Sequence, residues 1–241
     1  MKDFLLLKIS LSTYFWLLFA LFLVLSYTLP QYKFDAGALT LFSVNSFLYG
    51  FYISPILGAQ KTRIDSLHQT VRSEANAIFS LVLGLKKLPN DLHDKIQSMI
   101  EDYVHLKLDD PGVGGGERPY EDLITYCVDY KGAHKDQVDE VLQGLVANQQ
   151  NRTNFNMLVG SKVYANEWHI IAILFSITLG FILLISAQDQ PILHIVRALL
   201  CTGLTMLILN LVKLSTLTHK KAKQMWEPLQ KLVRTNFYRI D

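Results

Sequence analysis

Four long stretches of the chain are almost entirely apolar. Three of them contain no Asp, Glu, Lys or Arg, and they lie between residues 8 and 33, 35 and 61, and 167 and 189. A fourth runs from Pro191 to Val212 and contains His194 and one charged residue, Arg197. Because a helix of about 20 residues crosses the hydrocarbon core of a bilayer, the pattern predicts four transmembrane helices, at about 10–30, 37–57, 168–186 and 191–212.

The first apolar stretch has an alternative interpretation as a secretory signal, because Lys2 and Lys8 precede it. The stretch is longer and more aromatic than a typical signal core, and no cleavage site of small residues follows it before Pro30. We therefore expect it to remain in the protein as a membrane anchor.

Composition supports a membrane protein. Of the 241 residues, 50% are hydrophobic, and the mean hydropathy is +0.22, which is too apolar for an ordinary soluble domain of this length. The formal net charge is +2. We expect the lipid bilayer as a partner and no nucleic acid.

Basic residues gather at one end of each predicted helix pair. The short connections within the pairs, residues 31–36 and 187–190, carry a single Lys. The opposite ends carry Lys2, Lys8, Lys61, Arg63 and a basic C-terminal segment. By the positive-inside rule, both termini and the central segment are expected in the cytoplasm.

The predicted fold is an all-α membrane protein in which a helical insert separates two hairpins. Its parts are a first transmembrane hairpin at 1–57, a cytoplasmic helical insert at 58–166, a second hairpin at 167–212 and a basic cytoplasmic tail at 213–241. Apolar residues at helical spacing continue from the second span through residues 64–85 without a helix breaker after Gly58, so one helix is expected to leave the membrane unbroken. Further helices are expected at about 89–108, 120–130 and 135–166.

The insert has no pattern that indicates catalysis or metal binding. The glycine-rich loop at 109–119 lacks the Gly-Lys-Ser/Thr of a phosphate-binding loop, and a flexible connection or a subunit contact is expected there. Glu74, His68 and His93 lie on amphipathic helices without metal-ligand spacing, and we interpret them as solvated surface charges. Cys127 and Cys201 are expected to be free thiols. We therefore expect no enzyme activity, no metal and no cofactor.

The second span carries a polar stripe. Small and hydroxyl residues recur at intervals of three or four, which places them near one helix face, with an asparagine and a tyrosine beside it. In lipid such residues serve either close helix packing or the lining of an aqueous path. The pore-lining candidates are Ser43, Asn45, Ser46, Tyr49, Gly50 and Ser54.

The fourth span carries a comparable stripe that includes His194 and Arg197. Arg197 lies only about two helical turns from the predicted outer boundary, so its side chain can extend to the headgroups. Alternatively it faces protein, where Asp189 and Asp35 are the natural partners. Repeated around a symmetric axis, it would attract anions. We take His194 and Arg197 as ion-selectivity candidates, with packing and headgroup contact as the alternative.

Specific marks in the chain resemble a known family. Glu74-Ala75, Leu88-Pro89 and Asp102-Tyr103 punctuate two helices, and a later polar helix leads through Trp168 into the third span. This arrangement, with two spans, a helical insert and two spans, resembles the bestrophins and their bacterial bestrophin-like relatives. The resemblance implies a homo-oligomeric, pentameric ion channel of the bacterial inner (plasma) membrane.

Two hypotheses for function follow. The first is a passive, anion-favouring channel, such as a chloride channel, in which the second span lines a central pore and small ions and further copies of the chain are the partners. The alternative is a membrane-anchored signalling or defence effector whose insert binds a partner or a small ligand. A transporter is disfavoured because the chain has no inverted internal repeat.

Overall fold

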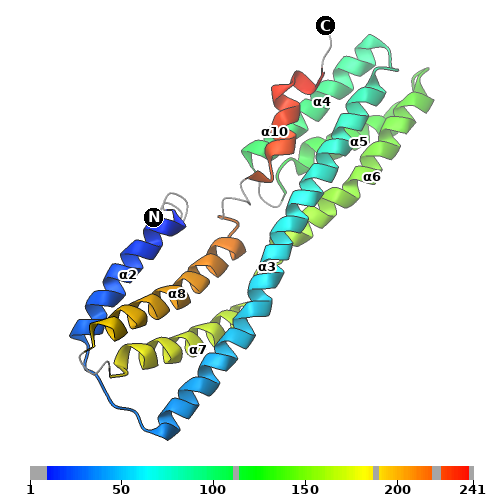
Figure 1. Ribbon diagram of the computed structural model, residues 1–241. Coiled ribbons are helices and arrows are strands. Elements are labelled where there is room, and N and C mark those ends of the chain that lie inside the picture. Colours follow the sequence, from blue (N-terminus) through cyan, green and yellow to red (C-terminus); the bar gives the residue numbers. More distant parts are fainter. Residues whose placement is uncertain (1–9, 111–113, 187–189, 219–223, 239–241) are drawn as a thin grey trace. The chain divides into compact units, whose positions relative to one another are not determined.

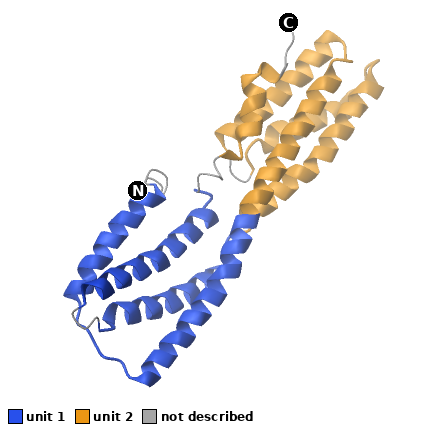
Figure 2. Cartoon of the chain, viewed as in Figure 1, with its two compact units in different colours: residues 1–62, 162–219 blue, residues 63–161, 220–241 orange. Residues whose placement is uncertain are grey.

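The regular structure of this protein is helical. The computed structural model describes residues 10–110, 114–186, 190–218 and 224–238, and within these ranges the only β-type pairing is an isolated bridge between Tyr32 and Ile185 (Figure 1). The chain divides into two units (Figure 2). We call residues 1–62 and 162–219 the apolar unit, and residues 63–161 and 220–241 the insert unit.

The apolar unit holds α2 (Leu11–Thr28), the first part of α3 (Ala36–Leu85), α7 (Ala165–Leu184) and α8 (Pro191–Ser215). Four helices in the described part of the chain are long and apolar enough to cross a membrane: α2, α3, one within Lys135–Leu184, and α8. Their positions agree with the four predicted spans, because long charge-free runs specify apolar helices locally.

Each helix of the apolar unit begins at a residue suited to that position. The Ser10 hydroxyl accepts a hydrogen bond from the Thr13 amide at 3.1 Å, and the Asp35 carboxylate accepts one from the Ala38 amide at 2.7 Å. Pro191 begins α8, where its missing N–H removes no helical bond. These caps satisfy or avoid the free N–H groups of a first helical turn.

The loops of the two hairpins lie side by side. The Tyr32 amide donates to the Leu184 carbonyl at 2.8 Å, and the Ser186 amide donates to the Tyr32 carbonyl at 3.0 Å. Two backbone hydrogen bonds therefore join the hairpins at one end of the apolar unit.

Apolar side chains both fill this unit and cover its outside. One buried cluster contains Phe22, Ile182, Ala198 and Cys201, and a second contains Tyr49, Ile53, Val163, Ile171 and Leu211. Large apolar side chains are also exposed, among them Leu41 at 70%, Phe51 at 71% and Ile192 at 65%. Exposed apolar surface on this scale requires a bilayer or partner subunits around it.

The insert unit packs the rest of α3 with α4 (Asn90–Asp109), α5 (Glu117–Asp129), α6 (Lys135–Gly160), α10 (Glu227–Arg234) and the short 3-10 helix η1 (Asn236–Tyr238). The α3 residues predicted to face a core, such as Leu67, Val71 and Leu85, are fully buried. Helix α3 runs unbroken from Ala36 to Leu85, as the absence of a helix breaker after Gly58 predicted.

The described residues of the predicted tail from 224 onward group with the insert unit. Helix α10 contacts α4, and its Leu229 and Leu232 are buried. The helix expected at about 135–166 begins at Lys135, but its predicted end is wrong, because α6 ends at Gly160 and α7 begins at Ala165. Glycine has low helix propensity, and the Ser161 hydroxyl bonds the Met157 carbonyl at 2.8 Å where α6 ends.

The described part of the glycine-rich loop enters α5 through a left-handed residue. Gly116 has φ +71°, and a Cβ there would lie 2.9 Å from the Tyr103 ring and 3.1 Å from the Tyr103 carbonyl oxygen. Glycine is therefore required at this position by both conformation and space.

Candidate functional sites

One face of α3 in the apolar unit is exposed. Ser43, Gly50 and Ser54 lie on this face together with the exposed rings of Phe47 and Phe51, whose centroids are 6.0 Å apart. A Cβ placed on Gly50 would meet nothing within 4 Å. We call these five residues the open face of α3.

The other three pore-lining candidates lie inside the unit. Asn45 donates to the Leu174 carbonyl at 3.1 Å and to the Thr178 hydroxyl at 2.8 Å, which fastens α3 to α7. Tyr49 is 3% exposed, and Ser46 is partly buried. Among the described residues, neither the Ser46 hydroxyl nor the Tyr49 hydroxyl has a hydrogen-bond partner. The structure therefore divides the six candidates into an exposed and an inward set.

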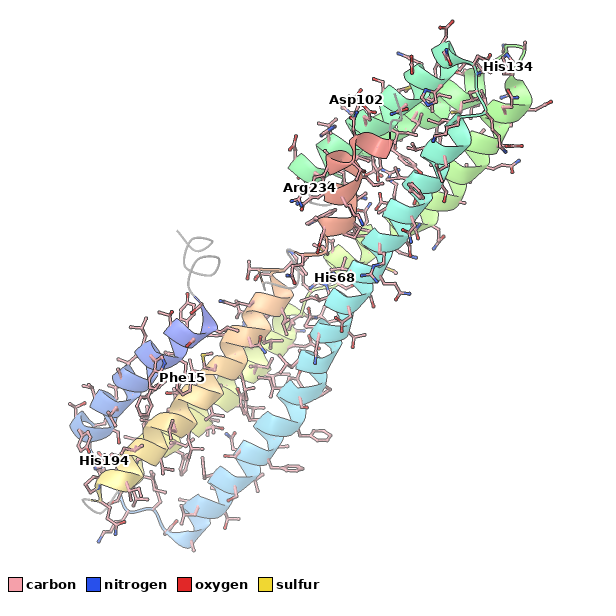
Figure 3. The ribbon with its side chains drawn as sticks, turned by 45° about the horizontal axis from the view of Figure 1, so that its top comes forward. Phe15, His68, Asp102, His134, His194 and Arg234 are labelled. Atoms are coloured by element: carbon pink, nitrogen blue, oxygen red, sulfur yellow. The ribbon has the colours of Figure 1, made fainter. Side chains whose placement is uncertain are left out.

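His194 and Arg197 lie between α8 and α2, the most extensively packed helix pair of the apolar unit. Each is 4% exposed. The Ser26 hydroxyl of α2 lies 2.7 Å from His194 Nδ1 and 3.4 Å from an Arg197 terminal nitrogen. The His194 ring also stacks on the Tyr27 ring, with centroids 4.1 Å apart. Figure 3 shows His194 near the N-terminal end of α8.

The acidic partners expected for Arg197 do not meet it within the described structure. Asp35 uses a carboxylate oxygen to cap α3, and among the described residues Arg197 forms no ion pair. Asp189 lies outside the described residues.

The insert unit contains a buried ionic cluster that the sequence analysis missed. Glu74, interpreted from the sequence as a solvated charge, is 0% exposed. Both of its carboxylate oxygens accept hydrogen bonds from Lys107 Nζ at 2.6 Å, and one of them also accepts a hydrogen bond from the Tyr103 hydroxyl. The interpretation of Glu74 as a surface charge is therefore wrong.

A second cation completes the cluster. The Arg152 guanidinium is 4.0 Å from the Tyr120 ring centroid and 3.7 Å from a Glu117 carboxylate oxygen. The Tyr120 hydroxyl donates to the Leu145 carbonyl at 2.7 Å and accepts from the Asn148 amide at 3.1 Å. We call Glu74, Tyr103, Lys107, Tyr120, Asn148 and Arg152 the ionic cluster.

Burial changes the acid–base behaviour of this cluster. Burial and the adjacent Glu74 carboxylate hold the pKa of Tyr103 well above its usual range. Burial raises the pKa of Tyr120 to about 12, and it lowers the pKa of Lys107 although Glu74 opposes the change. The groups are paired with one another, which suits them to joining four helices rather than to attacking a substrate.

A sequence signal for the cluster exists. Glu74 follows Leu67 and Val71 on the buried stripe of α3, and Lys107 follows Tyr103 on that of α4, each at helical spacing. A charged residue in register with a buried stripe indicates a paired buried charge.

The insert unit also has a groove of about 390 Å³ between α3 and α6. Its lining mixes small and polar residues, such as Ser80, Gly144 and Asn148, with the apolar side chains of Leu81 and Val141. Asn148 belongs to the ionic cluster as well, so the groove and the cluster share a residue.

Other reactive groups are not gathered into a site. Cys127 and Cys201 are both buried, and burial raises the pKa of the Cys127 thiol to about 11. Within the described ranges, no three His, Cys, Asp or Glu residues are placed to hold a metal ion. In Figure 3, His68 and His134 lie on well-separated stretches of the insert unit.

The described part of the chain is helical apart from one isolated bridge, and four of its helices are long and apolar enough to cross a membrane. The chain belongs to the bestrophin-like family, because the family model described as Bestrophin-like domain matches residues 12–219. The family predicted from the sequence is thereby confirmed. No curated protein and no solved structure matches the chain.

Proposed function

We propose that the protein is a passive ion channel that favours anions, in which several copies of the chain surround a pore lined by the open face of α3. The observation that carries this proposal is the exposure of Ser43, Gly50 and Ser54 on one helix face. Hydroxyl groups and close backbone approach suit contact with water or another helix better than contact with lipid tails.

The proposed pore requires assembly of several copies. One copy presents a single open face, whereas symmetric copies around an axis present the same face toward that axis. The bestrophins, to which the family is related, are in general anion channels, and the resemblance implies five copies. Exposed apolar side chains elsewhere on the apolar unit supply surface for lipid and for neighbouring copies.

An exposed cation supports a preference for anions. Lys61 is exposed on α3 and follows Ser54 by seven residues, close to two helical turns, so it continues the open face. Arg197, the selectivity candidate of α8, is buried against α2 and does not lie on that face. Basic residues at the insert ends of the spans support a cytoplasmic location for the insert and both termini. The bacterial inner membrane is the membrane that we propose.

The test is ion flux through purified protein in liposomes, with chloride and potassium compared. In a background without Cys127 and Cys201, a membrane-impermeant thiol reagent is expected to block flux in Ser54→Cys and Gly50→Cys. Ser46→Cys, on the same helix but turned inward, is the control and should be unaffected.

Charge reversal tests selectivity. Lys61→Glu should lower the chloride-to-potassium ratio several-fold, whereas Lys86→Glu, the same charge change on an exposed residue of the insert unit, should leave it unchanged. The proposal would be overturned if folded oligomers conducted neither chloride nor potassium. It would also be overturned if the thiol reagent blocked flux equally in Ser46→Cys and in Ser54→Cys.

The groove between α3 and α6 favours a second candidate function, a membrane-anchored effector whose insert binds a small ligand or a partner. Ser80→Trp would fill this groove. The channel proposal predicts unchanged basal flux in this variant, whereas the effector proposal predicts loss of binding to the insert without any flux in the unaltered protein.

A further inference from the structure

We infer that Arg197, together with His194 and Ser26, forms a binding site for an oxyanion inside the apolar unit, between α2 and α8. The site is distinct from the open face of α3. It goes beyond the proposed channel, because binding there does not depend on conduction.

The first observation is an incompletely satisfied guanidinium. Arg197 is 4% exposed. Among the described residues, its Nε and one of its two terminal nitrogens, Nη2, are buried without a hydrogen-bond partner. The other terminal nitrogen donates to the Ser26 hydroxyl at 3.4 Å. A buried cation that lacks a counter-charge and keeps free N–H groups is strongly disfavoured in an apolar setting.

The second observation is which nitrogens are free. In a guanidinium, the Nε–H bond and one N–H bond of Nη2 lie along the same edge and point in parallel. This edge matches the two oxygens of a carboxylate, nitrate, bicarbonate or phosphate group, which it binds through two parallel hydrogen bonds. A lone halide would use such a fork less completely.

Ser26 and His194 fix the guanidinium in place. Because arginine only donates, the Ser26 hydroxyl accepts from Arg197 and is then free to donate to His194 Nδ1, 2.7 Å away. The His194 ring is held in turn by stacking on Tyr27. The neighbouring core is made of Phe22, Ala198 and Cys201, which carry no negative charge.

Two sources supply the same chemistry: a small oxyanion from solution, and the headgroup phosphate of an acidic phospholipid. Full-length protein in detergent separates them. The first arm adds sodium nitrate at constant ionic strength, with a bulky sulfonate salt as its control. The second arm adds phosphatidylglycerol, with phosphatidylcholine as its control. Thermal unfolding reports binding in both arms.

Either nitrate or phosphatidylglycerol is expected to raise the unfolding midpoint of the unaltered protein, and the arm that responds identifies the source. Arg197→Gln should weaken the apparent affinity at least tenfold. Arg197→Lys, which keeps the charge and loses the fork, should weaken it less. Lys213→Gln, which changes a buried cation elsewhere on α8, is the matched control and should retain the response.

The unaltered protein is sufficient to refute the inference. If neither addition raises its unfolding midpoint above the matching control, the site does not bind an oxyanion. A response that appears only in Asp189→Asn would show instead that a carboxylate of the chain itself occupies the fork. Equal responses in the unaltered protein and Arg197→Gln would place the binding elsewhere.

Discussion

Replacing Glu74 by Gln tests whether the ionic cluster holds the insert unit together. The substitution keeps the shape of the side chain, removes its charge and turns one of two acceptor oxygens into a donor. Lys107 is 4% exposed, and its Nζ lies 2.6 Å from both Glu74 carboxylate oxygens. In Glu74→Gln, Nζ would face an amide N–H and would lose the anion with which it pairs.

The expected cost is large. Removing one partner of a buried ion pair destabilises a protein by about 3–5 kcal/mol, which is a sizeable fraction of the roughly 5–15 kcal/mol that stabilises a typical domain. Glu140→Gln is the matched control, because it makes the same change in a surface pair with Lys87 at 3.4 Å, whose side chains are 67% and 70% exposed. That pair should contribute no more than about 1 kcal/mol.

Trp226 offers a local assay. It is 8% exposed in the insert unit, and its ring packs edge-on against Phe155 at 5.3 Å. The chain has three Trp residues, so Trp16→Phe and Trp168→Phe leave this one as the reporter of denaturant unfolding in detergent. Equal destabilisation by Glu74→Gln and Glu140→Gln would refute the reasoning.

A double-mutant cycle sharpens the result. Lys107→Met removes the cation and keeps an apolar stem of similar length, so it should be much less harmful when Glu74→Gln is already present. Additive effects of the two substitutions would mean that the pair is not coupled.

Three further predictions concern other contacts. Gly116→Ala should destabilise the insert unit by at least about 1 kcal/mol, because Gly116 has a positive φ and lies close to Tyr103. Gly114 has a positive φ but no such close neighbour, so Gly114→Ala should destabilise the unit less in the same Trp226 assay. The contribution of Tyr120 to stability should be complete below pH 10 and fall as pH rises toward about 12, because the folded state holds the Tyr120 proton that the unfolded chain releases. Tyr120→Phe should reduce the decline in unfolding midpoints and leave the part that comes from Tyr103, whose pKa is also raised. Asn45→Leu should lower the thermal unfolding midpoint of the apolar unit, since it removes both hydrogen bonds from α3 to α7 and leaves the Thr178 hydroxyl oxygen without its donor; an unchanged midpoint would contradict this.

Much of the helical layout could be predicted because apolar runs and amphipathic stripes are local properties of the sequence. The four long apolar helices and the continuation of α3 followed from charge-free length and from the lack of a helix breaker after Gly58. The end of α6 was missed because glycine tolerates a helix interior at modest cost. The helix ends where the Ser161 backbone leaves the helical region, with φ −75° and ψ 73°, and the sequence alone does not specify this change.

The sites were less accessible to prediction because they depend on which face of a helix meets which neighbour. Ser43 and Ser46 were assigned to one polar stripe, yet Ser43 is exposed and the Ser46 hydroxyl is buried. Both faces of α3 are apolar enough to pack, so sequence periodicity does not distinguish them. Glu74 was misassigned for a related reason: its burial is decided by α4, which brings Lys107 to it from 33 residues along the chain.

The return of the C-terminal segment to the insert unit bears on how the protein is made. Residues 63–161 leave the ribosome well before α10, whose Leu229 and Leu232 are buried in the same unit. During synthesis of the second hairpin, the surface that α10 will cover on α4 remains open. The insert unit is therefore completed only after both hairpins have been synthesised.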